Sequence, residues 1–260
     1  MFLRRLRQDD DDSEPYWKQR SWQMSAGFIA LVIVMGALVA LTSSGSDSTG
    51  GGTARARASD GPLSGTATLV DGRPKDCATD DSAGDALPTA VPKDITWRTI
   101  GVVQVPVSAS AGPTRFQGAL WWCYAHTPTG AALAATAIIA QMSEPGWRTV
   151  ADQQVVAGTG QKMFVFQRSQ VADTARRTDG SSSSCVGFTV VSYTGEAATI
   201  ALLIKGTEGF LTTSVQVRWD DGDWKVLAGS DGSLYSGLTT VQNAGRYLVW
   251  RTSGVKDVTP

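Results

Sequence analysis

A long uncharged segment near the N-terminus constrains this chain more than any other feature of its sequence. No residue between Arg20 and Asp47 is charged, and the run WQMSAGFIALVIVMGALVAL extends from Trp22 to Leu41. As a helix with a rise of about 1.5 Å per residue, this run would be roughly 30 Å long, which matches the hydrocarbon core of a bilayer. The sequence therefore predicts one transmembrane helix over residues 22–42.

Basic residues are distributed unequally on the two sides of this predicted helix. Five of them precede it, at positions 4, 5, 7, 18 and 20, and the next one in the sequence is Arg55. Because basic residues remain on the cytoplasmic side of a membrane, we expect residues 1–21 to form a cytoplasmic tail and the rest to lie outside the cell membrane. The predicted helix would then act as an uncleaved signal-anchor, and the lipid bilayer would be a partner of the chain through this one helix. The alternative is a cleaved signal peptide, whose apolar region would be shorter, about 7 to 15 residues.

Residues 43–76 are rich in Ser, Gly and Thr and contain few apolar side chains. Such a segment buries too little apolar surface to offset the entropy lost on ordering it. We therefore expect a flexible linker with an average reach of about 30 Å. One extracytoplasmic α+β domain over residues 77–260 would follow this linker.

The first part of this domain is expected to contain two strands and a buried helix. A strand is predicted over residues 96–106, and a second extended run covers residues 116–125. Thr127 is a good N-cap residue, and Pro128 fits the first helical position, where its missing N–H leaves no bond unmade. The helix should end at Glu-Pro-Gly, residues 144–146, and the small and apolar residues on all of its faces predict burial on most sides.

The next segment is less regular in pattern. Residues 147–158 are expected to form a short helix or a turn that ends at Gly158. Residues 162–177 are compatible with a strand or a helix, and their C-terminal end favours a helix. The glycines of residues 157–162 predict a turn, because their spacing does not match a phosphate-binding loop.

The C-terminal part predicts an antiparallel sheet. Residues 185–194, 197–205 and 210–219 are apolar or alternate between apolar and polar, with turn residues between them. Asp221-Gly222 fits the positive φ angles of a tight hairpin turn. Consecutive strands joined by such short turns must be antiparallel. The fold class expected is thus α+β, with helices packed on one face of a curved antiparallel sheet.

Three cysteines allow three pairings and leave one thiol over. Because the domain is expected outside the membrane, one disulfide should form. The expected pair is Cys77–Cys123, which would fasten the end of the linker to the strand before the buried helix. Cys185 would then be a small buried apolar residue.

His126 is the single histidine of the chain and follows Cys123 by three positions. A Cys–His dyad could in principle activate a thiolate. A histidine directly before a Thr-Pro cap is more typical of a turn or of a hydrogen bond at a helix end. We therefore predict a structural role for His126, with no catalytic residue in the chain.

Metal, cofactor and nucleic-acid sites are not expected. The cysteines and His126 lack the close CxxC spacing of a zinc site, and the acidic residues 220, 221 and 223 are interpreted as a solvated turn rather than a calcium site. Residues 95–260 carry 13 basic and 11 acidic side chains, a difference of two, without the basic and aromatic interleaving of a nucleic-acid groove. Three tryptophans, Trp121, Trp122 and Trp250, are candidates either for the core or for contacts with a partner.

Several segments carry a resemblance to a known family. PTAVPKDITW, VPVSASAGP, CYAHTPTGAALAA, QQVVAGTGQ and VRWDDGDWKV, within about residues 75–252, resemble single-pass membrane proteins of actinobacterial conjugative and integrative elements. The overall plan is similar to that of TcpC and VirB-type inner-membrane components of type IV secretion systems. This resemblance implies a nuclear transport factor two-like fold, a cone of helices on a curved sheet. TcpC-type proteins have two such domains, whereas this chain has room for one.

The resemblance also implies a function. It predicts a non-enzymatic scaffold that helps to assemble a DNA-transfer channel, with other channel subunits or a second copy of itself as partners. The alternative is a small-molecule-binding or isomerase-like enzyme that uses the mouth of the same cone. Such enzymes need a buried acidic or histidine base, and the apolar central segments of this chain contain almost no carboxylates.

Overall fold

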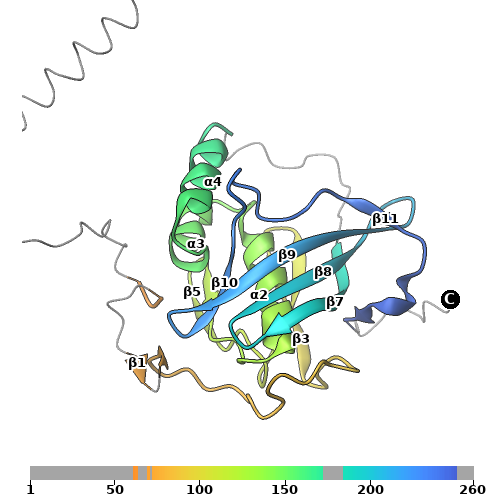
Figure 1. Cartoon of the computed structure of the whole chain (residues 1–260), viewed down its shortest axis with the longest axis horizontal. Helices are drawn as coiled ribbons and strands as arrows, with labels where there is room; N and C mark the ends of the chain where they lie inside the picture. The colour runs from red at the N-terminus through yellow and green to blue at the C-terminus, as the bar shows by residue number, and fades with distance from the viewer. Residues whose placement is uncertain (1–60, 64–68, 71, 172–183, 251–260) are drawn as a thin grey trace, which may run out of the picture. The chain divides into compact units, whose positions relative to one another are not determined.

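The computed structural model describes residues 61–63, 69–70, 72–171 and 184–250 (Figure 1). The predicted cytoplasmic tail 1–21, the predicted transmembrane helix 22–42 and most of the predicted linker lie outside these residues. Among the helices of the described ranges, none has the length and apolar character needed to cross a bilayer.

The described domain contains both helices and strands, which confirms the α+β class. The helices are α2 (Pro128–Gln141), α3 (Trp147–Gln154), α4 (Thr159–Ser169) and a short 3-10 helix, η2 (Ala244–Arg246). The strands before α2 are β1 (Leu69–Val70), β2 (Arg73–Pro74), β3 (Ile95–Ile100), β4 (Val103–Ser108), β5 (Arg115–Gln117) and β6 (Leu120–Trp122). The strands after α4 are β7 (Ser184–Thr194), β8 (Ala197–Lys205), β9 (Phe210–Asp220), β10 (Asp223–Val226), β11 (Thr239–Val241) and β12 (Leu248–Val249).

The later strands form one antiparallel sheet of six strands in the order β10-β9-β8-β7-β12, with β11 also paired to β9. Val215 and Val217 of β9 are buried, whereas Gln216 and Arg218 between and beside them are exposed, as the alternation predicts. Asp221 and Gly222 have φ angles of 53° and 79°, which confirms the tight hairpin turn between β9 and β10. The pairing of β7 with β8 contains two register irregularities, and such irregularities bend a strand.

Helix α2 lies behind the sheet in the view of Figure 1 and contacts β7, β8, β9 and β10 on one side, as well as β4, β6 and α3. Eleven of its 14 residues are buried, which confirms the predicted burial on most sides. The many alanines allow strands to approach the helix closely from different directions. The helix begins as predicted, because Oγ1 of Thr127 accepts a hydrogen bond from the N–H of Gly130 at 3.2 Å and Pro128 is the first helical residue.

Three details of the secondary structure differ from the prediction. Residues 96–106 form a hairpin rather than one strand, because Gly101 with a φ of 58° reverses the chain between β3 and β4. Gly118, also with a φ of 58°, divides the second extended run in the same way. Residues 159–162, predicted to be part of a turn, are instead the first turn of α4. The C-terminal end of the predicted segment 162–177 lies partly outside the described residues.

Part of the predicted linker is packed against the domain, so its expected end at residue 76 is wrong. Leu63 is 2% exposed, and its N–H donates to Oε1 of Gln153 in α3 at 3.2 Å. The strands β1 and β2 also belong to this segment. Composition did not reveal this packing because one buried leucine and a few polar contacts can hold a segment that is otherwise poor in apolar residues.

The three tryptophans that were candidates for the core or for partner contacts belong to the core, so the interface alternative is wrong for them. Trp121, Trp122 and Trp250 are 9%, 8% and 1% exposed. Trp250 stacks on Phe188 with ring centroids 4.4 Å apart, and Trp121 meets Phe116 edge to face at 5.2 Å. Their large apolar surface stabilises the domain internally.

Candidate functional site

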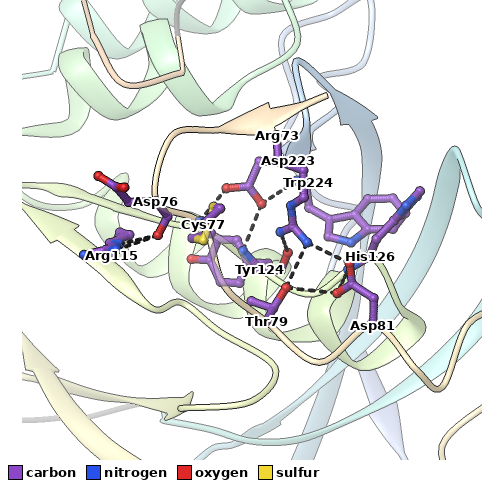
Figure 2. The surroundings of a disulfide bond; sticks show 11 residues. Arg73, Asp76, Cys77, Thr79, Asp81, Arg115, Tyr124, His126, Asp223 and Trp224 are labelled. Carbon is purple, nitrogen blue, oxygen red and sulfur yellow. Dashed lines mark hydrogen bonds and ion pairs between the residues drawn. A yellow bond between two sulfur atoms is a disulfide. The ribbon is translucent and has the colours of Figure 1, made fainter. Parts of the chain in front are cut away.

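Polar side chains and one disulfide surround the start of α2 and are here named the cap network (Figure 2). They come from the segment before β3, the segment between β6 and α2, and β10. The members are Arg73, Cys77, Thr79, Asp81, Cys123, His126 and Asp223.

The disulfide joins Cys77 to Cys123, as predicted, across a separation of 46 residues and a Cα–Cα distance of 5.4 Å. Cys123 is completely buried and has a φ of 72°, in the left-handed region that residues with a Cβ rarely adopt. Because its sulfur is bonded to Cys77, Cys123 has no thiol for His126 to activate. The disulfide therefore excludes a catalytic dyad of Cys123 and His126.

Asp223 holds the backbone around Cys123 in this unusual conformation. Its Oδ2 accepts from the N–H of Cys123 at 2.6 Å, and its Oδ1 accepts from the N–H groups of Tyr124 at 3.0 Å and of Trp224 at 2.9 Å. The residue is completely buried. Burial raises the pKa of Asp223 from 3.8 to about 6, although the three N–H donors act in the opposite direction.

The prediction of a solvated acidic turn at the tip of the β9–β10 hairpin is wrong for Asp223. The turn residues are Asp221 and Gly222, so Asp223 is already the first residue of β10 and faces the interior. Asp220 and Asp221 lie nearer the surface, where Nζ of Lys225 is 3.5 Å and 2.6 Å from their carboxylates. No group of three or more His, Cys, Asp or Glu within the described ranges is placed to hold a metal ion.

Arg73 links the segment before β3 to the start of α2. Its Nη1 lies 2.7 Å from Oδ2 of Asp81 and donates to Oγ1 of Thr79 at 2.8 Å. Its Nη2 donates to the carbonyl oxygen of Tyr124. Only 17% of the Arg73 side chain is exposed. Neither Arg73 nor Asp81 was singled out from the sequence, because no local pattern marks two charged residues that meet only after the chain has folded back on the helix.

His126 has a structural environment, as we predicted. Its backbone N–H donates to Oδ1 of Asp81 at 2.9 Å, and its ring Nε2 contacts the carbonyl oxygen of Gly195. The ring stacks on Trp219 with centroids 3.9 Å apart and an angle of 13° between the planes. The backbone N–H and the ring Nε2 of His126 are thus used within the fold.

The remaining cysteine, Cys185, is half-buried and forms no disulfide. Burial of its thiol raises the pKa from 9.0 to about 11. At neutral pH the thiol is therefore protonated and poorly nucleophilic. The side chain packs against the hydrophobic core but is half-buried, whereas a buried residue was expected.

The cap network as a whole fixes the path of residues 123–126. Every oxygen of the Asp223 carboxylate accepts from a backbone N–H, and the indole N–H of Trp224 donates to the carbonyl oxygen of Ala125 at 2.9 Å. The arrangement uses its charged groups to satisfy backbone donors and acceptors that are buried beside α2. Its chemistry is that of a structural clamp.

Comparison with known proteins places this domain in a family. No curated protein and no solved structure matches the chain. One family model matches residues 58–249, a range that contains the complete cap network and begins close to the buried Leu63. Since this match covers well over half of the 260 residues, the chain belongs to the family described as Domain of unknown function (DUF8175).

Proposed function

We propose that this protein is a membrane-anchored, non-enzymatic assembly component of a conjugative, type IV secretion-like DNA-transfer apparatus. In this proposal the helix over residues 22–42 holds the chain in the cell membrane with its N-terminus in the cytoplasm. The domain lies outside the cytoplasm and acts through contacts with other channel subunits or with a second copy. The Cys77–Cys123 disulfide supports an oxidising, extracytoplasmic compartment.

We also propose that the domain is a variant of the nuclear transport factor two-like cone. The order of elements supports this, because three helices precede an antiparallel sheet of consecutive strands and α2 packs against that sheet. Two additional hairpins, β3–β4 and β5–β6, stand before the helices in the chain. Their strands β4 and β6 also contact α2.

The observation that carries a contact function is the exposure of α4. None of its 11 residues is buried. Phe166 is 63% exposed and Met163, one turn earlier on the same side of the helix, is 38% exposed. We name Met163, Phe166 and Gln170 the α4 face. An exposed phenylalanine beside a flexible methionine is typical of surfaces that bind other proteins.

The body of the domain holds α4 through residues that flank the α4 face. Phe164 meets Trp147 edge to face with ring centroids 5.9 Å apart, and the side-chain amide of Gln167 donates to the carbonyl oxygen of Asp231 at 3.0 Å. Gly160 allows close approach, since a Cβ there would lie 2.5 Å from the carbonyl oxygen of Gly229. The helix is therefore anchored on one side while the α4 face stays accessible.

The proposal is tested by replacing Phe166 with aspartate in the full-length, tagged protein. The tagged protein is purified from membranes after crosslinking, and plasmid transfer is measured in a deletion strain complemented with each variant. We expect Phe166→Asp to lower transfer and the recovery of the transfer ATPase or other channel subunits by at least about tenfold. The matched control is Leu87→Asp, which alters a residue that is 60% exposed and lies far from α4 in the sequence.

Two results would contradict the proposed function. One is undiminished transfer in the deletion strain, combined with recovery of the tagged protein without other channel subunits. The other is release of a chain cut just after residue 41 into the medium, which would show that residues 22–41 act as a cleaved signal peptide. Equal loss of transfer in the Phe166→Asp and Leu87→Asp variants would remove the α4 face from the proposal.

A further inference from the structure

A groove of about 380 Å³ lies between the β3–β4 and β5–β6 hairpins, on a part of the surface not used by the cap network or by the α4 face. We name it the hairpin groove. Its polar and aromatic lining includes Thr96, Arg98, Ser108, Thr114, Arg115 and Phe116.

Two guanidinium groups line the hairpin groove. The guanidinium of Arg98 lies over the ring of Phe116, with its central carbon 3.8 Å from the ring centroid, and within the described part of the chain no hydrogen-bond acceptor contacts it. Arg115 donates from Nε at 2.8 Å and from Nη2 at 2.6 Å to the carbonyl oxygen of Asp76. Nη1 of Arg115 remains available. Stacking and backbone anchoring thus hold both guanidinium groups in place without neutralising their charge.

The groove carries a net positive charge. Asp76 is the one acidic residue of its lining, against Arg98 and Arg115. The contact between Arg115 and Asp76 uses the carbonyl oxygen of Asp76, so the guanidinium is not paired with that carboxylate. An oriented pair of guanidinium groups recognises carboxylate or phosphate oxygens through two parallel N–H donors.

A buried hydroxyl adds a second, independent feature. Oγ1 of Thr114 is shielded from solvent and has no hydrogen-bond partner among the described residues, although Thr114 lines the groove. Leaving such a group unpaired costs about 1–3 kcal/mol. Because Oγ1 exposes almost no surface, this hydroxyl belongs to the wall of the groove rather than to its open face.

The two hairpins are not joined to a larger sheet. Within the described ranges β3 pairs only with β4, and β5 pairs only with β6, so each hairpin has outer strand edges, on one of which Ser108 in β4 makes a bridge with Gly112. Such edges accept an extended peptide, which adds backbone hydrogen bonds to side-chain contacts. An extended polypeptide matches this combination of edges and guanidinium groups better than a compact ligand does.

We propose that the hairpin groove binds an extended acidic segment of a partner protein, with its carboxylates on Arg98 and Arg115. The disulfide shapes this site, because Asp76 and Ala78, on either side of Cys77, both line the groove. The inference concerns a surface separate from the α4 face and does not depend on the role in DNA transfer.

The test measures binding of a fluorescein-labelled oligoglutamate peptide to the full-length protein in detergent micelles by fluorescence anisotropy. An oligoglutamine peptide of the same length is the matched probe. We expect the oligoglutamate peptide to bind at least about tenfold more tightly, and Arg98→Gln to weaken its binding by about tenfold. Arg246→Gln, which removes the same charge from an exposed position in η2, should leave the affinity unchanged.

A second variant separates the two guanidinium groups from the wall of the groove. Thr114→Val removes the unpaired hydroxyl while retaining the shape of the side chain, so we expect the domain to unfold at the same or a higher denaturant concentration. Because that hydroxyl is shielded from solvent, the same variant should bind the oligoglutamate peptide with unchanged affinity. A loss of affinity as large as that of Arg98→Gln would contradict the assignment of binding to the guanidinium groups.

Three outcomes would overturn the inference. The first is equal affinity for the oligoglutamate and oligoglutamine peptides. The second is an equal effect of Arg98→Gln and Arg246→Gln, which would indicate attraction by total charge alone. The third is tight binding of a glycerol phosphate polymer in an Arg98-dependent manner with no binding of the oligoglutamate peptide, which would assign the groove to an anionic cell-surface polymer.

Discussion

Helices α2 and α4 belong to the same domain but have opposite environments. Eleven of the 14 residues of α2 are buried, whereas α4 has no buried residue among its 11. A disulfide, a buried carboxylate and a Thr-Pro cap fix the start of α2. α4 has no side-chain cap at its first residue and rests on the body of the domain by one side. The difference indicates a division between a helix that organises the fold and a helix whose surface is available for contacts.

The largest effect should come from removing the disulfide that constrains the start of α2. Replacing both Cys77 and Cys123 with alanine should lower the free energy of unfolding by about 4 kcal/mol, because the unfolded chain regains the entropy of a loop of 46 residues. Chemical denaturation of the purified protein measures this change. Cys185→Ala is the control and should cost much less. A double variant as stable as the wild type would show that the other members of the cap network suffice to hold α2.

The next effect is the dependence of stability on pH through Asp223. Its pKa is about 6 in the folded protein and near 3.8 in the unfolded chain, so the folded state binds a proton more tightly. As pH rises from about 4 to 7, this residue should therefore lower the free energy of unfolding by up to about 3 kcal/mol. The measurement is the difference in unfolding free energy between wild type and Asp223→Asn across this range. The exposed Asp231→Asn variant is the control, and a constant difference for Asp223→Asn would contradict the prediction.

A smaller change in the free energy of unfolding should show that α2 is packed more tightly than α4. Ala132→Leu adds volume at a completely buried position of α2 and should lower the free energy of unfolding by about 2 kcal/mol. Lys162→Leu places the same leucine at an exposed position of α4 and should alter stability by less than about 0.5 kcal/mol. Urea unfolding of both variants provides the comparison. Equal losses would mean that α4 is as tightly packed as α2.

The smallest expected effect on stability is that of Phe166→Asp in the α4 face. Because 63% of Phe166 is exposed, the variant should unfold within about 0.5 kcal/mol of the wild type. Thermal unfolding followed by circular dichroism tests this. A loss of several kcal/mol would indicate that Phe166 contributes to the core, and a transfer defect in that variant could then not be assigned to a lost contact.

Local patterns predicted the elements that depend on neighbouring residues. Thr127 and Pro128 specify the start of α2, and the alternation of β9 with Asp221-Gly222 specifies the last long hairpin. The pairing of Cys77 with Cys123 also followed from the cysteines and their compartment. In each of these cases the signal lies within a few residues or in a small number of possible pairs.

Contacts between distant segments were not visible in the same way. The core position of Trp121, Trp122 and Trp250 depends on which surfaces meet, and a tryptophan in the sequence suits a core and an interface equally well. The burial of Leu63 in the expected linker had no compositional signal. The hairpin turns at residues 101 and 118 were missed because a single glycine can lie within a strand or end one.

The amino-acid sequence alone thus determined an apolar segment of membrane-spanning length, the cap of α2 and the turn between β9 and β10. It also limited the cysteines to three possible pairs. All of these follow from composition or from spacing along the chain. The cap network and the hairpin groove arise only on folding. Asp223 accepts hydrogen bonds from the N–H groups of Cys123 and Tyr124, which are 100 and 99 residues away in the sequence. The physical reason is that a hydrogen bond or a groove depends on separation in space, and separation in space between distant residues is set by the packing of the whole domain.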